Sequence, residues 1–322
     1  MLTRRTILAA PLLAPLTARA QEAWPARPVR IVIPYPPGGS TDVLGRALAE
    51  RLQATIAGSS FVVENRPGGA AVVGTQAVAT AAPDGYTLVL GNNQTHAANA
   101  AMVRDLPYRP VEDFTPIGRL AEVHHALVVP ANSPARALAE LAARGKGGGK
   151  LTYASSGVGS ASHVIAESFV RREGLEATHV PYRGGAQATT DTISGTVDFF
   201  VSTWPQVVAL VKEGRLRCLG IGAPRRLPDL PDVPTFAEAG APYMAVDAWF
   251  GLWAPARSPA PVIARLSEAL PRILAEPEMV ERLHRLGFQP APLPAASFAE
   301  FQRAEVERWR ELVELTGIRL EG

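Results

Sequence analysis

The sequence predicts an α/β fold of two lobes, each a mainly parallel sheet flanked by helices. Short apolar runs alternate with stretches of helical period, which is the pattern of βαβ units. The alternation also begins twice, at Val29 and at Val123, and each half contains a strand, a Gly/Ser loop and a helix in that order. A chain of 322 residues that is 47% hydrophobic and 19% charged is long enough for two globular units. We therefore expect two lobes that face one another over a cleft.

The first 20 residues have the features of an export signal. Arg4 and Arg5 precede an apolar run from Ile7 to Leu16, and residues 18–20 read Ala-Arg-Ala, the small-x-small form of a cleavage site. The run is too short to span a bilayer. We expect a mature periplasmic protein that starts near Gln21. The paired arginines permit the twin-arginine route, although a general secretory signal looks much the same.

Charge and cysteine content exclude some partners and cross-links. The formal net charge of +2 falls to −1 once the three arginines of residues 1–20 are removed, so nothing indicates a nucleic-acid partner. Cys218 is the single cysteine, so no internal disulfide can form despite the exported address. We expect Cys218 to be a small buried residue.

The first unit of the chain runs from a predicted strand, Val29–Ile33, through the loop PYPPGG into a helix. Gly38 and Gly39 lack a Cβ and let the backbone approach a ligand closely, and Ser40 or Thr41 can cap the helix. A helix N-terminus offers unpaired N–H groups and the positive end of the helix dipole, which suit a carboxylate or phosphate. The alternative is a plain connection whose glycines only make the turn.

Two further strands complete this half of the pattern. Phe61–Glu64 and Tyr86–Leu90 read as strands on either side of a helix over residues 71–81. In parallel sheets ligands bind beyond the carboxyl ends of the strands. The loops PYPPGGST, NRPGG and GNNQTH are therefore expected on one rim.

The second half repeats this layout. Ala126–Val129 is a predicted strand, a helix follows over residues 131–145, and the strand Leu151–Ala154 leads through a Ser/Gly loop into another helix. That loop is a second candidate anion site. Strands and helices then alternate as far as LRCLGIGAP, which starts at Leu216.

After Gly222 the chain is expected to return to the first lobe. It is rich in proline at first, then forms a strand at Ala248–Trp253 and three amphipathic helices that begin near Pro261, Pro277 and Ser297. We expect the last helix to cap the first lobe. The predicted division is residues 21–122 and 222–322 for lobe 1 and residues 123–221 for lobe 2.

Common cofactor, metal and catalytic signatures are missing. GVGSAS at residues 157–162 lacks the third glycine of a dinucleotide fingerprint, and no GxxxxGK[ST], GxSxG, HExxH or CxxC occurs. His124 and His125 are adjacent on a predicted strand, so they point to opposite faces and cannot hold one metal together. We expect no cofactor and no metal.

Some polar residues have two interpretations. His163 lies in the first turn of a predicted helix, where it can reach a ligand or act as a base for Ser155 or Ser156; a structural helix-start imidazole is the other interpretation. Asp198 is expected inside an apolar strand, where its carboxylate either ties loops together or receives a ligand group. Asp42 and Arg46 can be an exposed i, i+4 pair.

Four aromatic residues are equally open. Tyr35 and Tyr182 precede glycine loops and can form an apolar wall of the cleft or anchor those loops. Phe199 and Trp204 have the same two interpretations.

Nine segments taken together resemble the Bug family, the periplasmic solute-binding receptors of tripartite tricarboxylate transporters. The resemblance runs from about Trp24 to the C-terminus. Its marks, in order, are WPARPVRIVIPYPPGGSTDVLGR, FVVENRPGGA, APDGYTLVLG, YASSGVGSASHVIAE, HVPYRGG, SGTVDFF, VPTFAEAG, WFGLWAP and WRELVELTGI. The chain departs from the family after NRPGG, where it reads AAVVG, and this puts ligand contacts from Gly68 and Gly69 in doubt.

The resemblance implies a type II periplasmic binding fold, or Venus flytrap, that closes over a carboxylate. In the family the loop matching Tyr35 to Thr41 holds a ligand carboxylate, largely through backbone and bridging water. The ligand-binding residues expected on this basis are Tyr35, Pro37, Gly38, Gly39, Ser40, Thr41, Asn92, Thr95, Ser155, Ser156, Gly159, Ser160, His163, Tyr182, Gly184, Asp198 and Thr203.

The function that the sequence favours is a non-enzymatic receptor. We expect a monomer that captures a small organic acid, such as a di- or tricarboxylate, an acidic amino acid or an aromatic carboxylate, and presents it to the permease subunits of a tripartite tricarboxylate transporter. One alternative is a periplasmic serine hydrolase that uses Ser155 or Ser156 with His163. The other is a ligand sensor for a membrane kinase.

Overall fold

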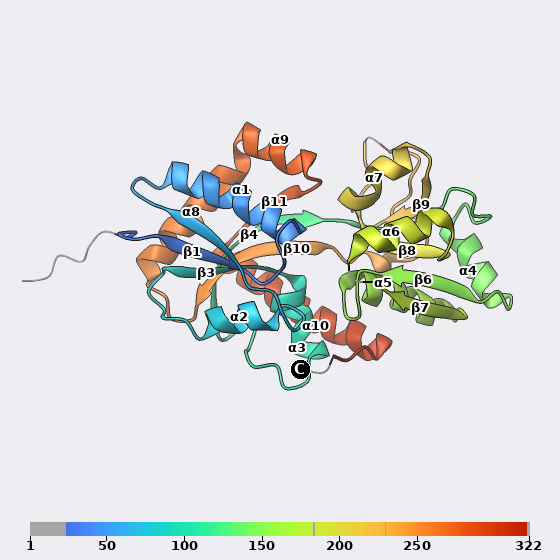
Figure 1. The fold of residues 1–322 in the computed structure, drawn as a ribbon, viewed down its shortest axis with the longest axis horizontal. Coiled ribbons are helices and arrows are strands. Elements are labelled where there is room, and N and C mark those ends of the chain that lie inside the picture. The colour runs from blue at the N-terminus through green and yellow to red at the C-terminus, as the bar shows by residue number, and fades with distance from the viewer. Residues whose placement is uncertain (1–23, 183, 229, 321–322) are drawn as a thin grey trace, which may run out of the picture.

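The computed structural model describes residues 24–182, 184–228 and 230–320, and the predicted export signal lies outside them. Two sheets with flanking helices form two lobes, which lie side by side in Figure 1. The two-lobed α/β prediction is confirmed. No helix among the described residues is both long enough and apolar enough to cross a membrane.

The first lobe is built on a six-stranded sheet of order β11-β4-β10-β3-β1-β2. Its strands are β1 (Val29–Ile33), β2 (Phe61–Asn65), β3 (Thr87–Asn92), β4 (Phe114–Val123), β10 (Ala248–Pro255) and β11 (Gln289–Pro294). The βαβ strands β1, β2 and β3 are parallel, as expected. The other three pair antiparallel, so the sheet is mixed, and β4 and β11 were not predicted.

Helices cover both faces of this sheet. On one face lie α1 (Ser40–Thr55), α8 (Ala260–Ala275) and α9 (Pro277–Arg285); on the other lie α2 (Val72–Ala79), the π-helix η1 (Gln94–Ala98), α3 (Asn99–Met102) and α10 (Ala295–Thr316) (Figure 1). The last helix packs against η1 and β4 of this lobe, and also against α5 (Ala161–Glu173) of the second lobe.

The second lobe has a five-stranded sheet of order β7-β6-β8-β5-β9. Its strands are β5 (His125–Pro130), β6 (Leu151–Ser155), β7 (Ala177–Pro181), β8 (Phe199–Thr203) and β9 (Leu216–Ile221). β6 is parallel to β7 and β8, whereas β5 is antiparallel to β8 and β9, so this sheet is mixed too. The prediction that each sheet is mainly parallel is therefore wrong, because the strands next to the crossings between the lobes pair antiparallel. α4 (Leu138–Lys146) and α5 share a hydrophobic cluster on one face, and α6 (Gly185–Ser194) and α7 (Trp204–Lys212) share another on the opposite face.

Consecutive residues of β8 point to these two different clusters. Phe199 packs with Tyr153 and Phe169 in the cluster of α4 and α5, and Phe200 packs in the cluster of α6 and α7. Cys218 is buried in the second cluster, and burial raises the pKa of its thiol to about 12. The prediction of a small buried cysteine is confirmed.

The chain crosses between the sheets where β4 is followed by β5, and again between β9 and β10 (Figure 1). Hydrogen bonds tie the two crossings together. Nδ1 of His124 lies 2.9 Å from Oδ1 of Asp247, and the N–H of Gly222 donates to the carbonyl of His125 at 2.7 Å. The first residues after β4 are therefore anchored to the segment that leads back into the first lobe.

A buried aromatic stack joins η1 to β10. The His96 imidazole lies 3.6 Å from the Trp253 ring, centroid to centroid, and burial lowers its pKa to about 3. Gln302 of α10 accepts from the Trp253 indole at 3.0 Å and donates to the carbonyl of His96. The last helix, α10, which was expected to cap the first lobe, is thus joined to both β10 and η1.

Candidate functional site

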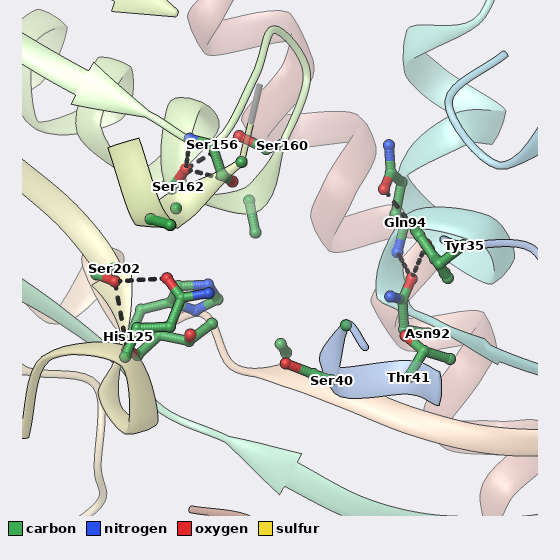
Figure 2. Close-up of a pocket in the computed structure, with 18 of the residues that line it drawn as sticks. Tyr35, Ser40, Thr41, Asn92, Gln94, His125, Ser156, Ser160, Ser162 and Ser202 are labelled. Carbon is green, nitrogen blue, oxygen red and sulfur yellow. Dashed lines mark hydrogen bonds between the residues drawn. The ribbon is translucent and has the colours of Figure 1, made fainter. Parts of the chain in front are cut away.

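A cavity of about 630 Å³ lies between the two lobes. Lobe 1 contributes residues 35–41 and 92–94 with Ala248 and Phe250, and lobe 2 contributes segments at the ends of β6, β7 and β8. Figure 2 shows the labelled residues of the two lobes on opposite sides of the space. The described lining residues include no Asp, Glu, Lys or Arg, so their polar groups are amides, hydroxyls, one imidazole and backbone.

Eleven of the predicted ligand-binding residues line this cavity. They are Tyr35, Pro37, Gly38, Gly39, Ser40, Thr41, Asn92, Ser156, Ser160, Gly184 and Thr203.

The β1–α1 loop presents a helix N-terminus to the cavity. Gly39 is the N-cap and makes no side-chain hydrogen bond, so the expectation that Ser40 or Thr41 caps the helix is wrong. No described residue accepts a hydrogen bond from the N–H groups of Ser40 and Thr41. These donors are among those that an α-helix leaves without internal partners. They are available to an anion in the cavity.

The Asp42 side chain anchors this loop through hydrogen bonds. Its carboxylate accepts from the N–H of Gly38 at 2.9 Å, from Nδ2 of Asn65 at 2.9 Å and from Nε of Arg46 at 3.0 Å. Burial opposes ionisation of Asp42, but the hydrogen bonds from Arg46, Gly38 and Asn65 outweigh it and lower the pKa. The predicted i, i+4 pair with Arg46 is confirmed, but Asp42 is only 3% exposed, so the pair is not exposed on its acidic side.

Gly38 has a backbone requirement of its own. Its φ of +81° lies in the left-handed region that favours glycine. Because its N–H is donated to Asp42, Gly38 shapes the loop and leaves the ligand to the residues that follow.

Tyr35 and Asn92 form the side of the cavity next to this loop. The Tyr35 hydroxyl donates to Oδ1 of Asn92 at 2.7 Å, and burial raises the pKa of Tyr35 above its usual range. Oδ1 of Asn92 also accepts from the N–H of Gln94 at 2.9 Å. The amide and phenol groups are thereby fixed in orientation (Figure 2).

The β6–α5 loop faces the first loop across the cavity (Figure 2). Ser160 caps α5 by accepting from the N–H of His163 at 3.3 Å. Oγ of Ser162 accepts from the N–H of Ser156 at 2.9 Å and lies 3.0 Å from Oγ of Ser160. The side chains of this loop therefore bond mainly to one another.

Ser155 and His163 lie outside the cavity, and they are not paired. Ser155 is fully buried and its Oγ lies 2.6 Å from Nε2 of His179, while Nδ1 of His163 accepts from the N–H of Gly159 at 3.2 Å. The two imidazoles stack at 3.7 Å. Burial first, and then the neighbouring His179, lower the pKa of His163 to about 4. The predicted Ser–His catalytic pair is therefore wrong, and His163 has the structural role.

Four more predicted residues do not line the cavity, namely Thr95, Gly159, Tyr182 and Asp198. Oγ1 of Thr95 accepts from the N–H of Asn92 at 3.0 Å, and Gly159 packs against Leu320. The Tyr182 hydroxyl donates to Asp191 at 2.7 Å, so Tyr182 anchors its loop.

Asp198 lies one residue before β8 rather than inside it, and its carboxylate accepts from the N–H and hydroxyl of Thr152. It joins the residue before β8 to strand β6 rather than to another loop, and it does not line the cavity. Phe199 and Trp204 are buried in the lobe 2 core. Of the four aromatic residues considered from the sequence, Tyr35 lines the cavity, together with Phe200 and Phe250.

The list of expected ligand-binding residues leaves out some lining residues, although part of them lie in segments that were expected at the site. They are Pro36, Asn93, Gln94, His125, Ala161, Ser162, Gly185, Ala186, Phe200, Val201, Ser202, Gln206, Ala248 and Phe250. Gln94 belongs to the GNNQTH loop, which was expected on the rim, whereas Ser202 belongs to the apolar strand in which Asp198 was expected. No pattern in the sequence indicated His125, because only its orientation brings it to the cavity. Gly68 and Gly69 are absent from the lining, in keeping with the doubt about them.

No group of three or more His, Cys, Asp or Glu side chains in the described part of the chain could hold a metal ion.

Comparison with known proteins gives consistent matches over nearly the whole chain. The family model described as "Tripartite tricarboxylate transporter family receptor" matches residues 44–318. Protein BugT of Bordetella pertussis is 33% identical over 316 residues, which cover 98% of this chain and 96% of BugT.

Two solved structures from Rhodopseudomonas palustris are similar in both sequence and fold. One, solved with adipate, is 32% identical with a TM-score of 0.82 and covers 93% of this chain and 100% of that one. MatC, with bound malate, is 33% identical with a TM-score of 0.78 and covers 90% of this chain and 100% of that one.

Proposed function

Because this chain belongs to the tripartite tricarboxylate transporter receptor family, we propose that it captures a small carboxylate-bearing metabolite in the cavity between its lobes. The family and its solved neighbours are periplasmic binding proteins, so the non-enzymatic interpretation is confirmed. We further propose that residues 1–20 direct export, and that the mature protein is a monomer that delivers its ligand to a membrane permease.

The observation that carries the proposal is the convergence of helix N-termini on a cavity whose described lining has no charged side chain. α1, α5 and α6 all begin at lining residues, namely Ser40, Ala161 and Gly185. The positive ends of helix dipoles and their unpaired N–H groups stabilise an anion without a cationic side chain. A carboxylate suits this environment, because it accepts several N–H and O–H bonds at once.

Adipate and malate in the two neighbours support the ligand class. Both are small carboxylates, and 630 Å³ lies within the range of cavities that enclose small ligands.

Ligand binding is proposed to favour closure of the lobes. The β1–α1 loop and the β6–α5 loop lie on opposite sides of the cavity, so a ligand that bonds to both stabilises the closed state through contacts that the open state lacks. The crossings at Val123–His125 and at 246–248 connect the lobes and are the places for a hinge.

A calorimetric and thermal-shift screen of the protein from Gln21 onward tests the proposal. The panel contains aliphatic di- and tricarboxylates, aromatic carboxylates and acidic amino acids, with the matching neutral amides as controls. A ligand of the folded state at ~100 times its Kd adds roughly 2.7 kcal/mol to the free energy of unfolding and raises the Tm. We expect a shift with at least one carboxylate and none with its amide. Shifts with amides alone would overturn the carboxylate assignment.

Delivery to a permease requires a separate test. The liganded protein should be retained by immobilised tripartite tricarboxylate permease subunits from the same organism, and the unliganded protein retained less. Retention by a membrane kinase periplasmic domain instead would support the sensor alternative.

A further inference from the structure

His125 is a buried polar residue that lines the cavity. The proposed capture of an anion assigns no role to it. It is the first residue of β5, directly after the crossing from lobe 1, and only 2% of its surface is exposed. Its side chain lines the cavity next to Ser202 (Figure 2).

The hydrogen bond of one ring nitrogen determines the chemistry of the other. Nδ1 of His125 lies 2.8 Å from the carbonyl oxygen of Val246. A carbonyl can only accept, so Nδ1 carries the proton. Burial lowers the pKa of His125, which keeps the ring neutral. Nε2 is then an acceptor without a proton of its own.

Nε2 has no hydrogen-bond partner among the described residues. Unlike Nε2 of His96, which is sealed inside the protein without a partner, Nε2 of His125 is not fully buried. Because His125 lines the cavity, the acceptor is open to a ligand there.

A second polar group without a partner lies beside it. His125 and Thr203 are directly opposite one another in the antiparallel pair β5–β8, so their side chains lie on the same face of the sheet. Oγ1 of Thr203 is sealed inside the protein and no described residue bonds to it, so Nε2 of His125 is the unpaired atom of this pair that meets the cavity. The neighbouring Ser202 hydroxyl, by contrast, is paired with Oε1 of Gln206 at 3.1 Å.

The surroundings restrict which donor can meet this acceptor. An ionised carboxylate brings no proton to Nε2. An ammonium brings protons, but three helix N-termini face the cavity and the described lining has no carboxylate to pair with a cation. A hydroxyl or an amide N–H meets both conditions.

We infer that His125 is a specificity-determining residue that accepts a hydrogen bond from an uncharged donor of the ligand. The preferred substrate is then a carboxylate that also carries a hydroxyl or an amide. This inference rests on the proposed function, since it assumes that a carboxylate is bound at the helix N-termini.

The test is calorimetric titration of the mature protein with matched ligands. The pairs are malate with succinate, 6-hydroxyhexanoate with hexanoate, and 4-hydroxybenzoate with benzoate. In the pair that binds best, the hydroxylated member should bind about three- to tenfold more tightly, the effect of one hydrogen bond between neutral groups. The methyl ether of that hydroxyl should lose the advantage, because it keeps an acceptor but has no donor.

Matched variants assign the effect to His125. His125→Asn retains an N–H that can donate to Val246 but removes Nε2, and should abolish the preference for the hydroxylated ligand. His124→Asn is the control, because His124 is adjacent, bonds to Asp247 and does not line the cavity; it should keep the preference. If His125→Asn does not fold, the methyl ether comparison with the native protein tests the same hydrogen bond without a variant.

The outcomes separate this inference from the proposed function. Carboxylates that bind without any preference for a hydroxyl would overturn the role of His125 and leave the receptor intact. A preference that survives in folded His125→Asn would do the same. If no carboxylate binds, the proposed function fails and the inference fails with it.

Discussion

The β1–α1 and β6–α5 units have the same layout in the sequence but different hydrogen bonding in the structure. Each passes from a buried strand through a Gly/Ser loop into a helix that begins at the cavity. In the first, Gly39 is an N-cap without a side-chain bond; in the second, Ser160 caps the helix and bonds with Ser162.

The difference lies in where the anchoring side chain comes from. In the first unit the anchor is Asp42, which lies within α1 and bonds to Gly38 and to Asn65 on the neighbouring strand. In the second unit the serines of the loop supply their own partners. One N–H group of the second helix, that of His163, is therefore occupied by a side-chain cap, whereas the first helix has no such cap, and we expect the first to be the stronger anion site.

The largest expected effect is from filling the space at the start of α1. Gly39 has φ −75°, and a Cβ there would lie 3.6 Å from the carbonyl of Pro36, an ordinary contact, so Gly39→Phe should fold. The ring would occupy the space next to the free N–H groups, and we expect at least about a hundredfold loss of carboxylate affinity by calorimetry, or about 2.7 kcal/mol.

Gly147→Phe is the control for this change, because Gly147 is exposed, has φ −84° and lies away from the cavity. It should leave affinity unchanged. Equal affinity of Gly39→Phe and the native protein would mean that the ligand is held elsewhere.

Removal of the anchor should weaken the fold of the first loop. Asp42→Ala leaves the N–H of Gly38 and the amide of Asn65 without their acceptor. We expect the free energy of unfolding in urea to fall by about 2–3 kcal/mol, the range for hydrogen bonds to a charged group. Asp42→Asn retains an acceptor and should fall by less. If both variants are as stable as the native protein, the carboxylate does not anchor the loop.

Acid should loosen the second unit before the first. The pKa of His163 is lowered from 6.5 to about 4, so the neutral ring stabilises the fold fully above pH 6.5, and this contribution is lost as the pH falls from 6.5 towards 4. The slope is at most about 1.4 kcal/mol per pH unit. The pKa of Asp42 is lowered below 3.8, so its contribution persists to more acidic pH.

Urea denaturation at pH 7.5, 6.5, 5.5 and 4.5 measures this slope. Other buried histidines such as His96 act in the same direction, so the informative quantity is the difference between the native protein and His163→Gln. The variant should lose less stability between pH 6.5 and 4.5. Identical slopes would show that His163 does not contribute.

The smallest effect is expected from the serine cluster. Ser162→Ala removes the acceptor for the N–H of Ser156, but the loop retains the cap bond of Ser160. We expect about 1 kcal/mol of destabilisation by urea denaturation. We also expect a smaller change in affinity than for Gly39→Phe. The reverse order of affinities would make the second loop the main anion site and would invert the comparison.

Many strands and helices could be predicted because their positions depend on patterns of neighbouring residues. β1 was predicted at Val29–Ile33 and is found there, and α9 begins at Pro277 as expected. β4 and β11 were missed because their partners lie far along the chain and proline interrupts both segments. The antiparallel strands of both sheets depend on the route of the chain between lobes, which short apolar runs do not specify.

The candidate site divides in the same way. Eleven predicted residues line the cavity because loops at the carboxyl ends of strands must meet at one edge of a sheet. Ser155 and Asp198 were predicted from the same loops, yet one pairs with His179 and the other with Thr152. Their directions depend on neighbours that are distant in sequence.

The sequence by itself therefore determined the order of most elements, the Gly/Ser loops at the ends of the strands and the family to which the chain belongs. These follow from hydrophobic period, glycine and proline positions and local motifs. Only the tertiary structure decided which helix N-terminus has a side-chain cap, which serines satisfy one another, and that Nε2 of His125 opens into the cavity. Hydrogen-bond partners decide each of these, and in His125 the partner is Val246, separated by 121 positions in the chain.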